Sequence, residues 1–175
     1  AACTDCSPGR FLNDPLTQNS EHHQNNHDSI LDCKICAAGQ WSDSGYHSCI
    51  ACAAGRYLDD FGFNDIMHDS IHRCEVCEAG QYSNISSGLC ADCPAGTFNS
   101  DAGINAFMHA GIESCFICRA GTWSSSRSLR CVKCKAGLFL TDSASASYFH
   151  DEISKCLLCG EGQYSDFGAS TCTAC

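Results

Sequence analysis

The sequence contains few large apolar side chains. Leu, Ile, Val and Phe account for only 31 of the 175 residues, and the hydrophobic fraction of 44% is reached because 18 Cys and 19 Ala are counted with them. Neither Cys nor Ala buries enough surface to offset the ordering of the backbone, which costs about 1–2 kcal/mol per residue. A conventional hydrophobic core is therefore not expected, and cross-links must supply the missing constraint.

Basic charge is also scarce. Four Lys and six Arg are spread singly along a chain with 20 acidic residues, so the net charge is −10. This balance argues against a phosphate-binding surface, and nucleic acid is not expected as a partner. No segment approaches the roughly 20 apolar residues of a membrane helix, so no membrane span is expected in this segment. Small cations and other proteins remain as candidate partners.

Cysteine is the residue that the sequence has in abundance. All 18 Cys lie in nine Cys-x-x-Cys pairs, at positions 3/6, 33/36, 49/52, 74/77, 90/93, 115/118, 131/134, 156/159 and 172/175. From Cys33 onward the first cysteines advance alternately by 16 and 25 residues, and a fixed period of 41 residues is typical of a repeat architecture. The period predicts a partial repeat with an extended long loop at 1–32, repeats at 33–73, 74–114 and 115–155, and a partial repeat at 156–175. Because the pattern is cut at both ends, we expect these residues to be a window on a longer array.

Two further positions recur in every loop. A glycine stands three residues after the second cysteine of each pair, and an aromatic residue follows two positions later: Gly9/Phe11, Gly39/Trp41, Gly55/Tyr57, Gly80/Tyr82, Gly96/Phe98, Gly121/Trp123, Gly137/Phe139 and Gly162/Tyr164. The glycine is expected to supply a turn with positive φ, and the ring to fold over the sulfurs as the small core of its loop.

The long loops carry a periodic polar pair and a short apolar pattern. Asp lies three residues after the aromatic and His six residues before the closing cysteine, which gives Asp14, His27, Asp60, His68, Asp101, His109, Asp142 and His150. These pairs are expected to hydrogen-bond within their own loops, with binding of a cation such as Zn²⁺ or Ca²⁺, or an inter-chain, pH-sensitive contact, as the alternatives. In the last three long loops an Ile lies three residues before the closing cysteine and four residues after Met67, Met108 or Phe149. This spacing predicts one helical turn with an apolar face.

The run Cys90-Ala-Asp-Cys93-Pro-Ala-Gly-Thr-Phe98 resembles the ephrin-receptor-like cysteine-rich repeat and the first half-module of tumour-necrosis-factor-receptor repeats. The long-loop signature from His68 to Ile71 is similar to arrays in large secreted proteins of algae and other protists. The resemblance implies a small disulfide-rich fold, an elongated tandem array of cystine-closed loops with short β-hairpins and little regular secondary structure. It implies no catalysis. The chain departs from the receptors because one half-module is iterated without variation.

Two disulfide pairings fit this motif. Bonding the second cysteine of each pair to the first of the next would enclose every Gly-x-aromatic unit in a loop of its own: Cys6–Cys33, Cys36–Cys49, Cys52–Cys74, Cys77–Cys90, Cys93–Cys115, Cys118–Cys131, Cys134–Cys156 and Cys159–Cys172. That pairing would leave Cys3 and Cys175 facing outward along the chain. The alternative is an interleaved pairing, such as Cys33–Cys49 with Cys36–Cys52, which the spacing alone does not exclude.

Metal binding and redox chemistry are the rival uses of so many cysteines. Two Cys-x-x-Cys pairs 12 residues apart also suit a zinc ribbon. Each such site needs two pairs, however, and nine pairs would leave one pair over. The Asn84-Ile85-Ser86 sequon favours a secreted protein and makes Asn84 a candidate glycosylation site. A thioredoxin-like role would need a βαβ context and one activated thiol. No metal or cofactor is expected.

The sequence therefore predicts an extracellular structural protein, secreted or at the cell surface. No nucleophile, paired carboxylate or phosphate loop stands out from the repeat, so no enzyme activity is expected. The favoured role is a segment or subunit of a fibre, stalk or cell-surface appendage such as a flagellar hair, with other copies of itself, neighbouring repeats of a longer chain or glycans as partners. The alternative is a receptor or adhesion ectodomain that binds a protein ligand.

Overall fold

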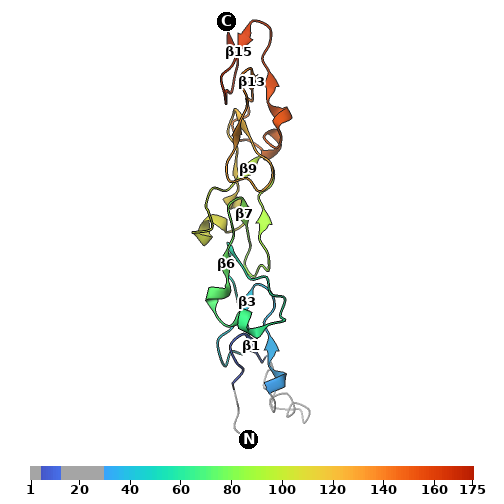
Figure 1. Ribbon diagram of the computed structural model, residues 1–175, viewed down its shortest axis with the longest axis vertical. Coiled ribbons are helices and arrows are strands. Elements are labelled where there is room, and N and C mark those ends of the chain that lie inside the picture. The colour runs from blue at the N-terminus through green and yellow to red at the C-terminus, as the bar shows by residue number, and fades with distance from the viewer. Residues whose placement is uncertain (1–4, 13–29) are drawn as a thin grey trace. The chain divides into compact units, whose positions relative to one another are not determined.

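The computed structural model describes residues 5–12 and 30–175, and Figure 1 shows short strands and single helical turns joined by long irregular loops. Eight two-stranded sheets follow one another along the chain. They pair β1 (Arg10–Phe11) with β2 (Lys34–Ile35), β3 (Gln40–Trp41) with β4 (Ile50–Ala51), β5 (Arg56–Tyr57) with β6 (Glu75–Val76), β7 (Gln81–Tyr82) with β8 (Ala91–Asp92), β9 (Thr97–Phe98) with β10 (Phe116–Ile117), β11 (Thr122–Trp123) with β12 (Val132–Lys133), β13 (Leu138–Phe139) with β14 (Leu157–Leu158), and β15 (Gln163–Tyr164) with β16 (Thr173–Ala174). The described residues contain no α-helix. The fold class is confirmed as a small disulfide-rich tandem array with short hairpins and little regular secondary structure.

Eight disulfides close consecutive loops. They join Cys6–Cys33, Cys36–Cys49, Cys52–Cys74, Cys77–Cys90, Cys93–Cys115, Cys118–Cys131, Cys134–Cys156 and Cys159–Cys172. This is the pairing in which each second cysteine bonds to the next first cysteine, and it is not the interleaved one. As cystines, these sixteen residues have no thiolates to offer a zinc ion. Cys175 is exposed and unpaired, and Cys3 lies outside the described residues.

The repeated glycines begin each hairpin. All eight adopt a positive φ between 70° and 82°, as the sequence predicts, because only glycine takes this conformation without strain. At Gly96 the neighbouring loop adds a second requirement, since a Cβ there would lie 2.0 Å from the Ser147 carbonyl oxygen. The glycine therefore serves both the turn and the close approach of the next long loop.

The long loops contain 3₁₀ turns where one apolar helical turn was predicted. They are η2 (Ile30–Asp32), η3 (Asp65–His68), η4 (Ile71–Arg73), η5 (Ala106–His109), η6 (Ile112–Ser114), η7 (Ser147–Phe149) and η8 (Ile153–Lys155). The predicted apolar face was wrong: Met67 is 37% exposed and Ile71 53% exposed. Each described long loop after Cys52 has two separate turns, and the residue that points inward is the histidine beside Met67, Met108 or Phe149.

Contacts divide the chain into two compact units. The first contains Ala1–Glu75 and Asn84–Leu89, and the second contains Val76–Ser83 and Cys90–Cys175. Each has one small apolar cluster around a cystine. In the first, Trp41 packs against Cys52, Leu58 and Cys74. In the second, Trp123 and Leu138 pack against Cys134, Leu140 and Cys156.

The aromatic rings are not the innermost side chains of their loops. Seven of the eight are half-buried and Tyr164 is 51% exposed. The residue immediately after the aromatic is the buried one, with 0–7% of its surface exposed at Ser42, Leu58, Ser83, Asn99, Ser124, Leu140 and Ser165. Successive residues of a strand face opposite ways, so the half-buried aromatic leaves the inward position to its neighbour.

Candidate functional site

Consecutive loops are joined by backbone hydrogen bonds at these buried positions. The N–H of Gly96 donates to the carbonyl of Ser124 at 2.8 Å, and the N–H of Gly121 donates to the carbonyl of Leu140 at 2.8 Å. The bonds from Gly9 to Ser42, Gly39 to Leu58, Gly80 to Asn99 and Gly137 to Ser165 have the same form. Each glycine thus holds the residue after the next loop's aromatic, which explains why that residue is buried.

The serine of the short loops adds a second bond between loops. The hydroxyl of Ser124 donates to the carbonyl of Thr97, 27 residues earlier, at 2.8 Å. Ser42 and Ser165 reach the carbonyls of Arg10 and Leu138 in the same way. A buried hydroxyl needs a hydrogen-bond partner, and the carbonyl of the preceding loop supplies it.

Three histidines are the largest fully buried polar side chains among the described residues. The side chains of His68, His109 and His150 are 0% exposed. Their Nδ1 atoms donate to backbone carbonyls 28 residues earlier, those of Gln40 (2.6 Å), Gln81 (2.7 Å) and Thr122 (2.7 Å). Their own carbonyls accept the N–H groups of Ser42, Ser83 and Ser124. Each histidine therefore attaches a long loop to the short loop before it through both its ring and its backbone.

The periodic aspartates lie against the other ring nitrogen. Nε2 is 3.3 Å from Asp60 Oδ1 in His68, 3.0 Å from Asp101 Oδ1 in His109 and 2.9 Å from Asp142 Oδ2 in His150. The structure thus brings three of the four predicted Asp/His pairs together, and Asp14 and His27 lie outside the described residues. We call each set of Asp, His and preceding carbonyl a histidine junction. The sequence predicted hydrogen bonds within the long loop, and the contact between Asp and His is such a bond. It did not predict the bond from the ring to a carbonyl of the preceding loop.

The geometry of a junction accommodates a hydrogen on each ring nitrogen. A backbone carbonyl and a carboxylate can both only accept, so each ring nitrogen must carry a hydrogen for both contacts to be hydrogen bonds. With both hydrogens present, the junction is an ion pair between the aspartate and a ring that has no exposed surface. With both nitrogens used in this way, none is left to ligate a metal. Among residues 5–12 and 30–175, no three His, Cys, Asp or Glu side chains come together as a metal site.

Hydrogen bonds keep the junction carboxylates ionised. Burial acts to raise the pKa of Asp60, but the Phe63 N–H, the His68 ring and the Gly62 N–H outweigh it and lower the pKa. The Ile104 N–H, the His109 ring and the Asn105 N–H lower the pKa of Asp101.

At the third junction the Ser145 hydroxyl is the main cause of a lowered pKa. It outweighs the opposing effect of burial and, with the His150 ring and the Ser145 N–H, holds the pKa of Asp142 at about 2. All three carboxylates are thus stabilised in the charged form that pairs with the histidine.

Acid is expected to destabilise the chain in a defined window. A carboxylate whose pKa is lower in the folded state stabilises the fold above its unfolded pKa of 3.8, and that stabilisation is lost as the pH falls through the folded pKa, which is about 2 for Asp142. Denaturant titrations at pH 7, 4, 3 and 2 should therefore show stability falling mainly below pH 4. In the triple variant Asp60→Asn, Asp101→Asn, Asp142→Asn the decline should be shallower. Part of the decline should remain in this variant, because Arg10 and Arg73 lower the pKa values of Asp65 and Asp69, which are unchanged. An unchanged acid profile in the triple variant would contradict the role given to the junctions.

Four histidines, His22, His23, His47 and His72, lie outside the 41-residue period of the sequence. His47, His72 and Asn84 are exposed. His22 and His23 lie outside the described residues. The exposed Asn84 follows the buried Ser83 and precedes a turn in which Ser86 has a φ of 62°.

No protein-family model and no curated protein matches this chain. In the part of the chain that the structure describes, no helix has the length and apolar character needed to span a bilayer. Eight consecutive intramolecular disulfides are typical of extracellular or secreted proteins, and tandem repeats of this kind are typical of extracellular structural proteins or ectodomains.

Proposed function

We propose that this chain is a non-enzymatic structural protein of the extracellular space, a segment or subunit of a fibre, stalk or cell-surface appendage such as a flagellar hair. Its partners would be other copies of itself or neighbouring repeats of a longer chain. The resemblance of its Cys-x-x-Cys-x-Ala-Gly-x-aromatic run to ephrin-receptor-like repeats supports an extracellular setting.

The observation that carries this proposal is the repetition of one set of contacts between loops. The histidine junction recurs three times with the same 28-residue separation. The glycine-to-carbonyl bond recurs at six loop boundaries. Loops attached by the same bonds present the same backbone at regular intervals, and a regular surface favours assembly with other regular surfaces.

Electron microscopy of the native material, and of the purified chain at increasing concentration, tests this role. Fibres or bundles with a regular axial spacing would support it. Dispersed single particles that capture one protein ligand would contradict it and would favour the receptor or adhesion alternative.

N-linked glycosylation at Asn84 is expected when the chain is made in a eukaryotic secretory pathway. The side chain is exposed, and its sequon is complete. Mass spectrometry before and after enzymatic deglycosylation should show one glycan, which Ser86→Gly should abolish while keeping Asn84. Glycine tolerates the φ of 62° at this position, so loss of the glycan in that variant would reflect the sequon and not misfolding. An unmodified Asn84 in the secreted chain would refute the prediction.

A further inference from the structure

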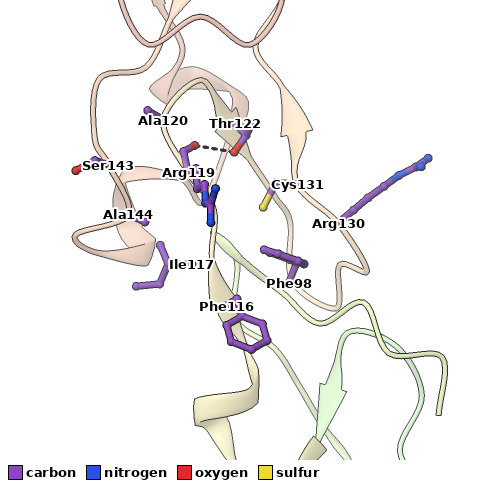
Figure 2. A pocket seen from close by; sticks show the side chains of 10 residues that line it. All are labelled: Phe98, Phe116, Ile117, Arg119, Ala120, Thr122, Arg130, Cys131, Ser143 and Ala144. Atoms are coloured by element: carbon purple, nitrogen blue, oxygen red, sulfur yellow. Dashed lines mark hydrogen bonds between the residues drawn. The ribbon is translucent and has the colours of Figure 1, made fainter. Parts of the chain in front are cut away.

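The second unit contains a hollow of about 890 Å³ beside β9 and β10. Its apolar wall includes Phe98, Phe116 and Ile117, and the two phenyl rings lie with their centroids 6.1 Å apart. Figure 2 shows Arg119 in the middle of the lining residues, while the side chain of Arg130 extends away from them. The hollow thus combines an aromatic wall with a central guanidinium group, which suits an aromatic side chain accompanied by a carboxylate.

The hollow lies in the one basic stretch of an acidic protein. Residues 114–141 contain five basic residues and no acidic residue, although the whole chain has a net charge of −10. Arg127 is paired with Glu78 at 3.0 Å. Within the described part of the chain, no carboxylate lies within ion-pair distance of the other four basic residues, Arg119, Arg130, Lys133 and Lys135. Their charge is therefore available to a partner.

This combination of residues is not a general property of the repeat. One period earlier, Glu75 and Glu78 stand in place of Phe116 and Arg119. One period later, Gly160 stands in place of Arg119. The disulfides, glycines and histidine junctions explain the repeated positions, but they do not require an unpaired arginine at this one.

A complementary segment lies in the long loop of the first unit. Phe61 is 64% exposed and Phe63 is 85% exposed, and the neighbouring Asp59 is exposed as well. Asp60 Oδ1 accepts the N–H groups of Gly62 and Phe63, each at 2.8 Å, which fixes the tip of the loop. A loop already held in place loses little conformational entropy on binding. Its surroundings are acidic, since residues 1–75 contain 11 acidic and 4 basic residues.

We propose that the Asp59–Phe63 loop of one copy binds in the Arg119 hollow of a second copy. The phenyl rings would pack against Phe98 and Phe116, and the Asp59 carboxylate would pair with Arg119. The proposal rests on the proposed structural function and names the contact through which copies associate. Because the loop and the hollow are different surfaces of the same chain, the contact is heterologous, and its repetition would add copies head to tail.

Sedimentation of the full chain over a range of concentration and salt tests the contact. The chain should self-associate, and more weakly at high salt because the charges are screened. Arg119→Glu and Asp59→Arg should each weaken association by about tenfold or more, since like charges would then face each other. Mixing the two variants should restore association, because the natural hollow of Asp59→Arg can bind the natural loop of Arg119→Glu and the altered hollow meets an altered loop of opposite charge. Asp166→Arg, beside the exposed Phe167, is the matched control and should associate like the natural chain.

Arg119→Glu is suited to this test because the preceding repeat already carries Glu at the equivalent position, Glu78, within the same disulfide pattern. A natural chain that stays monomeric at high concentration and low salt would overturn the proposal. Association that neither variant weakens would also overturn it, while fibres seen under those conditions would leave the proposed function standing. If a monomeric chain bound a sulfated sugar or an aromatic carboxylate through Arg119, the hollow would belong to that ligand and the proposal would fail.

Discussion

Reduction of the disulfides is expected to unfold the whole chain. Among the described residues, the only buried aliphatic side chains are Leu58 and Leu140, and each lies in a cluster with two half-cystines. Loops with Cys–Cys separations of 13 to 27 residues each contribute about 3 kcal/mol in the loop-entropy model, although such contributions do not simply add. Once the cystines are cut, the described residues keep two small leucine clusters and three histidine junctions, which are few against the cost of ordering the whole backbone.

Circular dichroism and hydrodynamic radius, followed as reductant is added, should show loss of structure and expansion of the chain. The same buffer with oxidised reductant is the control. Removing only the Cys118–Cys131 bond, by replacing both residues with Ser, should instead open that loop and its immediate neighbours, because repeats contact little beyond the next repeat. A fully reduced chain that kept its radius and its protected amides would show that the fold does not depend on the cystines.

Cysteine content and spacing predicted a disulfide-rich repeat, and the resemblance to ephrin-receptor-like repeats supplied the rest of the fold class. A cystine and a positive-φ glycine each constrain the backbone at a fixed place, so a pattern such as Cys93, Gly96 and Phe98 predicts a turn and a hairpin almost independently of the residues around it. The Asp and His of each long loop were also singled out, because a polar pair that recurs at one spacing requires a structural reason.

The position of the core could not be predicted in the same way. The residue after the aromatic is buried in seven of the eight loops and is Ser, Leu or Asn, which share no hydrophobicity or size. At six of these positions a glycine of the preceding loop donates to the backbone carbonyl, and a backbone acceptor leaves no mark on the sequence. The carbonyl that accepts the hydrogen bond from each histidine ring could not be predicted for the same reason, because it belongs to residues with different side chains, Gln40, Gln81 and Thr122. The constant spacing of 28 residues is the signal that could have identified it.

Replacement of His109 by Ala is expected to open one histidine junction selectively. The ring is 0% exposed and bonds to Gln81 and Asp101. Its removal leaves a cavity, deprives the Gln81 carbonyl of its 2.7 Å donor so that only the 3.4 Å bond from Asn99 remains, and takes one hydrogen-bond partner from the Asp101 carboxylate. Truncation of a large buried side chain costs on the order of 3 kcal/mol, and polar groups left unpaired add to that cost. His72→Ala, at an exposed position, is the control and should change stability by less than about 0.5 kcal/mol.

Native-state hydrogen exchange measures this effect at the junction itself. The Ser83 N–H donates to the His109 carbonyl, and the Ser124 N–H makes the same bond to the His150 carbonyl of the next junction. A local loss of about 3 kcal/mol corresponds to roughly a hundredfold faster exchange at Ser83. Because stability in a repeat array is set by nearest neighbours, exchange at Ser124 should change far less.

A second variant separates the ion pair from the filling of space. His109→Gln keeps much of the side-chain volume and can offer an N–H donor, but it carries no charge, so it should recover only part of the protection at Ser83. Full recovery would show that the His109 ring contributes little beyond volume and one hydrogen bond. Unchanged exchange at Ser83 in His109→Ala would show that the junction does not hold these loops together. Equal acceleration at Ser83 and Ser124 would show that the second unit opens as a whole, against the expectation that each junction holds its own pair of loops.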